Sequence, residues 1–135
     1  MKIRRVSIII FFNEKKRILL QDRTGINKFG LKYKWGFFGG GIEENETPKH
    51  AVIRETKEEL DFELKNFKYI GKYEGKINDN ISIILYAFIS PLFDNLTKFK
   101  QKEGRKMKLF SLIEAEKLKL PEYDKRVIID LKNIL

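Results

Sequence analysis

Three consecutive glycines stand shortly before a helix start, and this arrangement restricts the possible folds of the chain more than any other feature. Gly39–Gly41 follow the apolar pair Phe37–Phe38, which predicts a short strand that ends where the backbone can approach a ligand closely. Thr47 and Pro48 then predict a helix start, because threonine caps free N–H groups and proline suits the first helical position. The helix is expected to continue to about Leu60, so that a strand, a glycine turn and a helix follow one another.

Apolar segments on both sides of this helix have the composition of β-strands. These further strands are expected over Val6–Phe12, Arg17–Gln21, Leu64–Tyr73, Ile81–Ser90 and Met107–Phe110. A second helix is expected to begin at Pro121. Strands before and after a central helix, together with a terminal helix, indicate an α/β fold in which a mixed sheet lies between helices.

Length and composition indicate one domain over residues 1–135, because chains of this size usually form a single core. The hydrophobic fraction of 42% excludes an intrinsically disordered chain. The absence of cysteine excludes disulfide frameworks and thiolate metal sites, and it agrees with a cytoplasmic location. The apolar run Val6–Phe12 is far shorter than the ~20 residues that span a bilayer, so no membrane association is expected.

The predicted helix carries three glutamates at helical spacing. At about 100° per residue, Glu55, Glu58 and Glu59 fall on one face, so that three carboxylates lie together. A solvated acidic face is the plain alternative for such a pattern. The adjacent glycine turn favours a metal site, since Mg²⁺ binds oxygen ligands, takes few carboxylates and leaves positions for water and phosphates. We therefore expect Mg²⁺ as the cofactor, with Mn²⁺ as the alternative.

The charge distribution agrees with a cation site inside a basic protein. The chain has a formal net charge of +9, yet eight of its 19 acidic residues lie between Ile42 and Glu63. A basic surface attracts anions. The pattern therefore suggests a cation held where an anionic substrate arrives, although surface lysines can also reflect solvation alone.

The spacing of glycine, glutamate and arginine in this region resembles a known signature. Gly40 is followed after five residues by Glu46, and after seven more by the run Arg54–Phe62. This pattern is similar to the motif of the Nudix hydrolases, and the surrounding elements resemble the MutT-type branch of that family. Thr56 differs from the motif, where an aliphatic residue is usual, and so does Asp61, where a glycine usually ends the helix.

The resemblance implies a Nudix-type α/β/α sandwich with a central mixed sheet and a Nudix box at about residues 40–62. It also implies a metal site whose ligands are the carboxylates and one carbonyl of Glu55, Glu58, Glu59 and Gly39. Arg54 would orient these carboxylates, and Glu46 would support the loop before the helix.

The resemblance further implies substrate contacts outside the helix. Arg23 matches a position that contacts phosphate, and Asp124 falls where MutT-type members read a purine base. Gly40 would lie against the substrate. Phe37 and Trp35 could stack on a base, although core packing is the alternative for both, and the single histidine, His50, is expected to be an ordinary exposed residue.

The stretch Lys102–Gly104 resembles one where MutT-type members place an additional acidic residue near the metals, so the general base is expected to be Glu103. Glu55 is the alternative, because the family does not keep this role at one position. A carboxylate in this role takes a proton from the water that attacks phosphorus. Lysines and arginines surround Glu103 in sequence and would attract phosphate, with solvation as the alternative explanation.

The reaction expected from the resemblance is hydrolysis of a (d)NTP or an oxidised purine NTP to a nucleoside monophosphate and pyrophosphate. Two alternatives remain within the family, namely cleavage of ADP-ribose or nucleotide sugars and cleavage at the 5′ end of RNA. A non-catalytic module that binds nucleotide or nucleic acid is a third. We expect a small-molecule nucleotide as the partner, with nucleic acid less favoured, and a monomer or a homodimer.

Overall fold

The structure is a computed structural model that describes residues 2–24, 33–92, 98–100 and 106–135. Within these ranges the strands are β1 (Lys2–Phe12), β2 (Ile18–Asp22), β3 (Trp35–Gly36), β4 (Phe38–Gly41), β5 (Lys68–Asn78), β6 (Ile81–Pro91) and β7 (Met107–Phe110). The helices are α1 (Pro48–Leu60), α2 (Leu112–Lys117) and α3 (Glu122–Ile134). None of these helices is both long and apolar enough to cross a bilayer.

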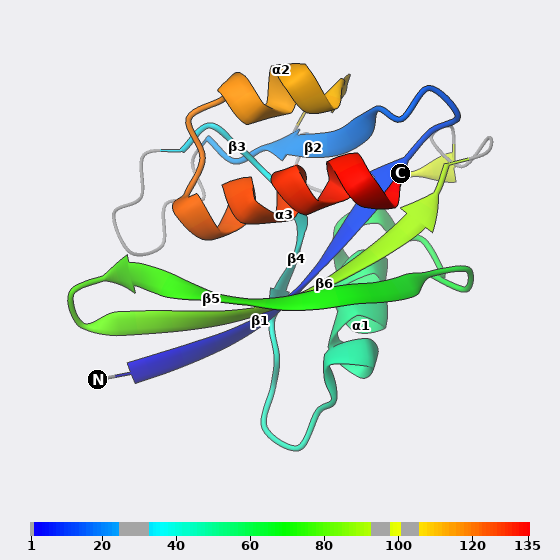
Figure 1. Cartoon of the computed structure of the whole chain (residues 1–135). Helices are drawn as coiled ribbons and strands as arrows, with labels where there is room; N and C mark the ends of the chain where they lie inside the picture. The colour runs from blue at the N-terminus through cyan, green and yellow to red at the C-terminus, as the bar shows by residue number, and fades with distance from the viewer. Residues whose placement is uncertain (1, 25–32, 93–97, 101–105) are drawn as a thin grey trace.

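The strands of the described residues form one mixed sheet of seven strands with the central order β3-β2-β1-β6-β5 (Figure 1). β1 and β6 run parallel over the whole length of both strands, whereas the other strand pairs are antiparallel. One edge of β1 is shared, because β4 pairs with Val6–Ile9 and β2 joins at Phe12. The glycines of β4 therefore lie beside the middle of the sheet.

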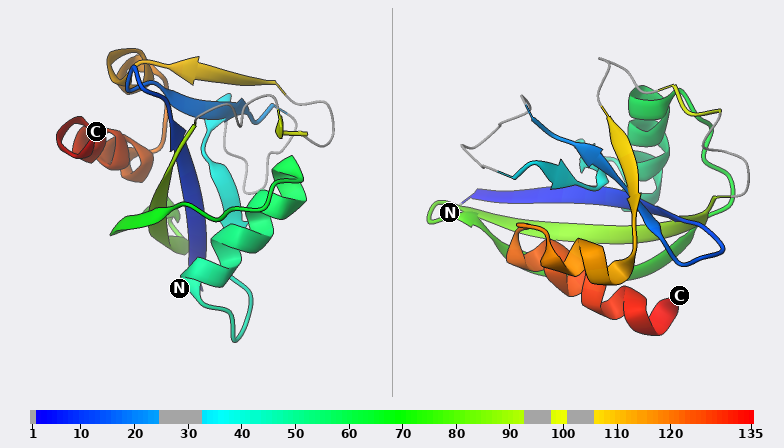
Figure 2. Two further views of the ribbon diagram at one scale, coloured as in Figure 1. Left: turned by 90° about the vertical axis from the view of Figure 1, so that its right-hand side faces the viewer. Right: turned by 90° about the horizontal axis from the view of Figure 1, so that it is seen from above.

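The helices lie on both faces of this sheet. Figure 2 shows α1 on one side and the α2–α3 pair on the other. One buried cluster joins the sheet to α3 through Val127, Ile128 and Leu131, and a second joins it to α1 through Val52 and Leu60. The arrangement confirms the expected α/β/α sandwich with a mixed central sheet.

Helix α1 begins and ends as the sequence predicts. Thr47 accepts a hydrogen bond from the backbone N–H of His50, and Pro48 occupies the first turn. At the other end Asp61 adopts the left-handed conformation at φ 50°, and its N–H bonds to the Lys57 carbonyl. Thr56 is buried and donates a hydrogen bond of 2.7 Å to the Val52 carbonyl, so its hydroxyl is satisfied in the place of an aliphatic side chain.

The sequence-based prediction is wrong in the bounds of two strands, and it omits one short strand and one helix. β1 begins at Lys2 rather than Val6, because its pairing with β6 extends to Lys2, and the two-residue strand β3 was not expected. β5 spans Lys68–Asn78, whereas Leu64–Tyr73 was expected, because Leu64 is buried outside any strand against the α1 side of the sheet. The short helix α2 was not expected. It begins at Ser111 with a capping box, in which the Ser111 and Glu114 side chains each accept a hydrogen bond from the other residue's backbone N–H.

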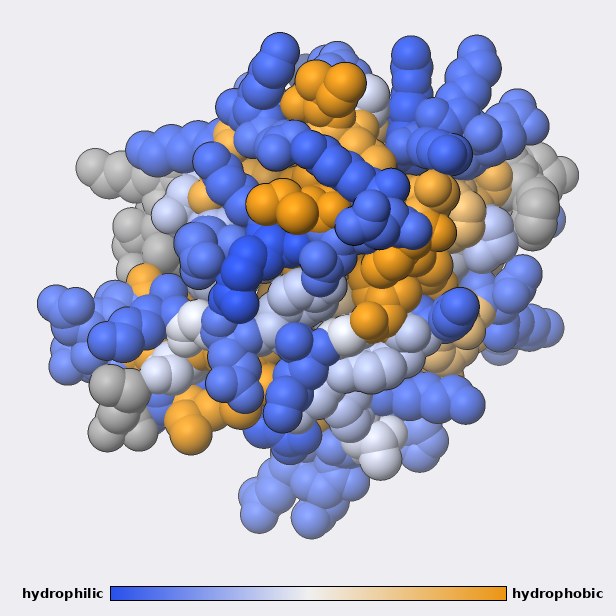
Figure 3. Space-filling model, viewed as in Figure 1, coloured by the Kyte–Doolittle hydropathy of each residue, from blue (hydrophilic) through white to orange (hydrophobic). Residues whose placement is uncertain are grey.

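Polar side chains cover most of the face that Figure 3 shows. Apolar side chains gather on this face near α2 and α3. The exposed large apolar residues on these helices are Ile113, Ile129 and Ile134.

Candidate active site

Arg54 of α1 contacts both the loop before the helix and the glutamates on the acidic face of the helix. The Arg54 guanidinium contacts both carboxylate oxygens of Glu46, at 2.8 and 2.9 Å, and donates to the Gly41 carbonyl at 2.9 Å. Such paired charge-assisted bonds fix geometry well. They also lower the pKa of Glu46 to about 2. The same guanidinium reaches Glu55 at 2.9 Å and Glu58 at 3.3 Å, so two of the helix carboxylates lie around one arginine.

The Glu55 carboxylate lies directly against the glycine strand. A β-carbon placed on Gly40 would lie 2.5 Å from the carboxyl carbon of Glu55, so only glycine fits there without a shift. Burial, the largest cause, raises the pKa of Glu55, while the hydrogen bond from Arg54 lowers it. The lack of a side chain at Gly40 thus brings a half-buried carboxylate next to the partly buried backbone of β4.

The Glu59 carboxylate is the most deeply buried of the three. It accepts hydrogen bonds from the Gln21 amide at 2.9 Å and from the Gly39 N–H at 2.8 Å. Burial raises the pKa of Glu59 to about 7, and these two hydrogen bonds oppose that rise. Gln21 also donates to the Phe37 carbonyl, so one buried amide links α1, β2 and the residue before β4.

Glu58 lies at the open end of this group. Its side chain is 56% exposed. Among the described residues, no group of three or more acidic, histidine or cysteine side chains is arranged so that it could hold a metal ion. The chemistry of the donor set nevertheless suits a hard divalent cation, because carboxylate oxygens and backbone carbonyls are its preferred ligands and an open site leaves room for water and phosphates.

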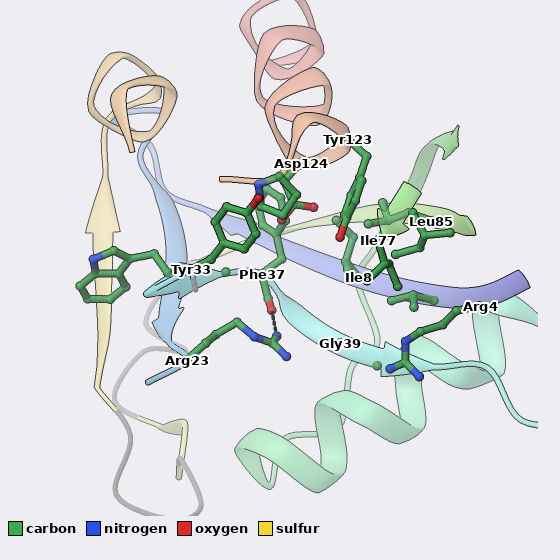
Figure 4. Close-up of a pocket in the computed structure, with 16 residues that line it drawn as sticks. Arg4, Ile8, Arg23, Tyr33, Phe37, Gly39, Ile77, Leu85, Tyr123 and Asp124 are labelled. Atoms are coloured by element: carbon green, nitrogen blue, oxygen red, sulfur yellow. Dashed lines mark hydrogen bonds between the residues drawn. The ribbon is translucent and has the colours of Figure 1, made fainter. Parts of the chain in front are cut away.

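A pocket opens on the other side of β4, between the sheet and the start of α3 (Figure 4). Its apolar floor comes from three neighbouring strands, with Val6 and Ile8 on β1, Ile83 and Leu85 on β6, and Ile77 on β5. Its walls are formed by charged and aromatic side chains, glycines and one proline, namely Arg4, Arg23, Tyr33, Trp35, Gly36, Phe37, Gly39, Gly40, Pro121, Tyr123 and Asp124. The pocket therefore extends from α3 to the glycines that lie over Glu55.

Asp124 and Arg23 are the charged groups at the α3 end of this pocket. Asp124 is 9% exposed, and burial raises its pKa to about 7, while the positive charge of Arg23 opposes that rise. Arg23 donates a hydrogen bond of 3.2 Å to the Phe37 carbonyl (Figure 4). Two residues far apart in sequence, one expected to contact a phosphate and the other a base, thus line one pocket.

Replacing Asp124 with asparagine should stabilise the protein more at pH 8 than at pH 5. The folded-state pKa of Asp124 is raised, so the folded chain retains a proton that the unfolded chain loses above about pH 4. The stability of the wild type therefore falls as the pH rises towards 7, whereas the asparagine variant has no proton to lose. We expect the variant to gain roughly 2 to 4 kcal/mol at pH 8 relative to wild type, and less at pH 5.

Urea denaturation at both pH values measures this difference. Glu122→Gln is the matched control, since Glu122 is exposed in the same helical turn and should give the same small change at both pH values. An Asp124→Asn variant whose stability difference from wild type is the same at pH 5 and pH 8 would contradict the expectation.

The remaining predicted residues fall into three groups. His50 is exposed, as expected. Phe37 is 4% exposed and packs in the core, and it also lines the pocket. Trp35 packs edge-on against Phe110, with 5.0 Å between the ring centroids. Glu103, together with Lys102 and Arg105, lies outside the described residues.

Gln21 was missed by sequence reasoning. The available signal was a single amide in an otherwise apolar strand, Ile18–Gln21, because a buried amide requires hydrogen-bond partners. Its partners here are Glu59 and the backbone of Phe37, which fix the inner carboxylate.

A model of the NUDIX domain matches residues 1–131, so the chain belongs to the Nudix family. The 8-oxo-dGTP diphosphatase of Escherichia coli (strain K12) is 28% identical over 134 residues, which are 99% of this chain and 100% of that protein. The CTP pyrophosphohydrolase of the same strain is 31% identical over 93 residues, which are 69% of this chain and 66% of that protein.

A third relative matches over a shorter stretch. The RNA pyrophosphohydrolase of Marinomonas sp. (strain MWYL1) is 39% identical over 67 residues, which are 50% of this chain and only 38% of that protein. The family and these relatives support a hydrolase that acts on acid anhydrides, as the sequence predicted.

Solved structures agree on the fold. The MutT protein from Methanosarcina mazei Go1 superposes with a TM-score of 0.81 at 18% identity, over 98% of this chain and 95% of that one. The Escherichia coli ORF135 protein superposes with a TM-score of 0.79 at 25% identity, over 99% of this chain and 91% of that one.

Proposed function

We propose that this chain hydrolyses a nucleoside triphosphate, either a (d)NTP or an oxidised purine NTP, to a nucleoside monophosphate and pyrophosphate. The observation that carries the proposal is the pocket that extends from Asp124 to the glycine strand, with the Glu55 carboxylate against that strand. A nucleotide has an apolar base and an anionic end, and this pocket offers groups suited to both. The relative named 8-oxo-dGTP diphosphatase, which aligns over its full length, supports the same reaction.

We infer that the reaction depends on Mg²⁺, with Mn²⁺ as the alternative. Glu55, Glu58 and Glu59 would hold the cation, together with the Gly39 carbonyl. When bound, a divalent cation neutralises phosphate oxygens and lowers the pKa of bound water. Arg54 would keep Glu55 and Glu58 in place, since it contacts both while anchored to Glu46.

The other groups have roles that follow from their chemistry. Arg23, whose guanidinium lies in the pocket, would bind a phosphate through its planar fork. Asp124 would hydrogen-bond the edge of the base at the α3 end, with Phe37 and Gly40 as walls. A carboxylate, Glu103 or Glu55, would accept the proton of the attacking water.

We further infer that residues 1–135 act as one Nudix domain in the cytoplasm, as a monomer or a homodimer, on a free small-molecule nucleotide.

Product analysis tests the proposed reaction. The purified chain would be incubated with Mg²⁺ and, separately, with dNTPs, 8-oxo-dGTP, ADP-ribose, nucleotide sugars, diadenosine polyphosphates and 5′-triphosphate RNA. We expect monophosphate and pyrophosphate from at least one triphosphate, and far slower product formation by a Glu55→Gln variant. Cleavage of ADP-ribose alone would keep the reaction class and overturn the substrate, and turnover of none would favour a binding module.

Cleavage at the 5′ end of RNA is the second candidate. The relative named RNA pyrophosphohydrolase, which matches half of this chain, and the net charge of +9 favour it. A basic protein attracts a polyanion, so this activity should fall as salt is raised. Faster hydrolysis of 5′-triphosphate RNA than of any free triphosphate in the panel would favour cleavage at the 5′ end of RNA.

Replacing Glu103 with glutamine should lower kcat by about 10²-fold, which is the usual contribution of a general base. Magnesium affinity should change little, because the three helix glutamates would remain. The measurement is the steady-state rate together with Mg²⁺ titration of both proteins. Unchanged turnover would remove Glu103 from the reaction and leave Glu55 as the base.

A further inference from the structure

The pocket contains an arginine that the resemblance does not point to. Arg4 lies on β1 and faces the same side of the sheet as Val6 and Ile8, because alternate residues of a strand point to the same face. It lines the pocket and is half-buried, whereas the next residue, Arg5, is exposed and donates to the Tyr86 hydroxyl on the opposite face. Two adjacent arginines therefore have different surroundings.

Arg4 lies at the end of the glycine strand. Val6 pairs with Gly41 in the sheet, so Arg4 stands just beyond the last residue of β4. A β-carbon placed on Gly41 would lie 3.5 Å from one terminal nitrogen of Arg4. In Figure 4, Arg4 and Arg23 lie on opposite sides of Gly39, with Asp124 nearer to Arg23. The pocket thus has one positively charged side chain on each side of the β4 glycines, Arg23 on one and Arg4 on the other.

The charges of both arginines reach the pocket interior. Burial is the largest cause that raises the pKa of the Tyr123 hydroxyl, and the positive charges of Arg23 and Arg4 oppose that rise. Tyr123 lines the same pocket. A phosphate matches the planar fork of a guanidinium with two parallel hydrogen bonds.

The glycines explain how one ligand could contact both sides of β4. The Glu55 carboxylate lies against Gly40 on the α1 side, and Arg4 lies against Gly41 on the pocket side. No side chain of β4 separates them. A phosphate chain that passes from the pocket over this strand to the carboxylates would pass beside Arg4.

We infer that Arg4 binds a phosphate group of the substrate at the end of the pocket away from Asp124. This inference rests on the proposed function, because it places a nucleotide in the pocket. The phosphate has two chemical sources, namely the 5′-polyphosphate chain of a nucleotide or the phosphate on the ribose 3′-oxygen that links a second nucleotide.

Calorimetric titration with ligands that resist hydrolysis tests this inference. The ligands are α,β-methylene GTP and the dinucleotide that carries the same 5′-triphosphate analogue and a 3′-linked adenosine, each with Mg²⁺. We expect Arg4→Leu to weaken binding by at least about 10-fold, since a hydrogen bond to a charged group is lost. Arg5→Leu is the matched control and should change the affinity less than about twofold, because Arg5 faces away from the pocket.

The two ligands separate the two sources. An equal loss on both ligands assigns the polyphosphate chain, and a larger loss on the dinucleotide assigns the 3′-linked phosphate. Arg4→Lys, which keeps the charge, should recover part of the affinity and shows that the loss does not come from misfolding. Equal affinity of Arg4→Leu and wild type for both ligands would overturn the inference.

Failure of the inference about Arg4 can be distinguished from failure of the proposed reaction. Binding that depends on Arg4 without turnover of any triphosphate would overturn only the proposed reaction. Turnover of a triphosphate that is indifferent to Arg4→Leu, with unchanged KM and affinity, would overturn only the role of Arg4. Failure of the wild type to bind either ligand would overturn both.

Discussion

Replacing Glu55 with glutamine should lower kcat by about 10³-fold, at the upper end of what loss of one electrostatic group costs an enzyme. The Glu55 carboxylate lies against Gly40, where the pocket meets the acidic face of α1. An amide of the same shape carries no charge to hold a cation and no basic oxygen to accept a proton. Steady-state kinetics with the best triphosphate of the panel measures the loss.

The same variant should fold normally. Burial already disfavours the charged form of Glu55, and Arg54 retains its contacts with Glu46 and Glu58. We therefore expect the melting temperature of Glu55→Gln to equal or exceed that of wild type. Glu63→Gln is the matched control for loss of a charge, because Glu63 is exposed and pairs only with the nearby Lys65 among the ion pairs described. Wild-type turnover in Glu55→Gln would exclude this carboxylate from the reaction.

The local signals in the sequence were sufficient for α1. Its start depends on Thr47 and Pro48, which act within one turn, and its end depends on Asp61, whose short polar side chain tolerates the left-handed conformation. The same holds for the acidic face, because helical periodicity alone places Glu55, Glu58 and Glu59 together. Features that depend on neighbouring residues in sequence were therefore predictable.

The bounds of β5 were not predictable in the same way. The part beyond the expected end at Tyr73 contains Gly75 and the exposed Glu74 and Lys76, which weaken the strand signal, and pairing with β6 decides the structure there. Leu64 has the composition of a strand residue but is buried by the α1 side of the sheet instead. Tertiary contacts overrode local propensity in both cases.

The contacts that complete the site come from distant segments. Gln21 reaches Glu59 across 38 residues of sequence, and Arg4 meets the β4 glycines through strand pairing. Neither residue belongs to the motif. Only the fold brings Gln21 to Glu59 and Arg4 to the pocket, so the sequence alone gives no reason to select Arg4 over Arg5.

Replacing Gly39 with alanine should lower the stability of the protein by at least about 3 kcal/mol, because two separate penalties act at this position. Gly39 has φ 139°, a conformation that residues with a β-carbon rarely adopt. A β-carbon there would also lie 2.1 Å from the backbone carbonyl oxygen of Ser7. That oxygen belongs to the central strand β1, so it cannot move without disturbing the sheet.

Gly41→Ala separates this effect from the general loss of a glycine. A β-carbon on Gly41 would make only an ordinary contact of 3.5 Å with the Arg4 side chain. We expect its melting temperature to stay close to wild type, while that of Gly39→Ala falls by roughly 10 °C. Thermal unfolding followed by circular dichroism measures both. Equal melting temperatures for the two variants would mean that β4 can move away from β1, and the Gly39 N–H that holds Glu59 would then be far less firmly positioned than its 2.8 Å hydrogen bond indicates.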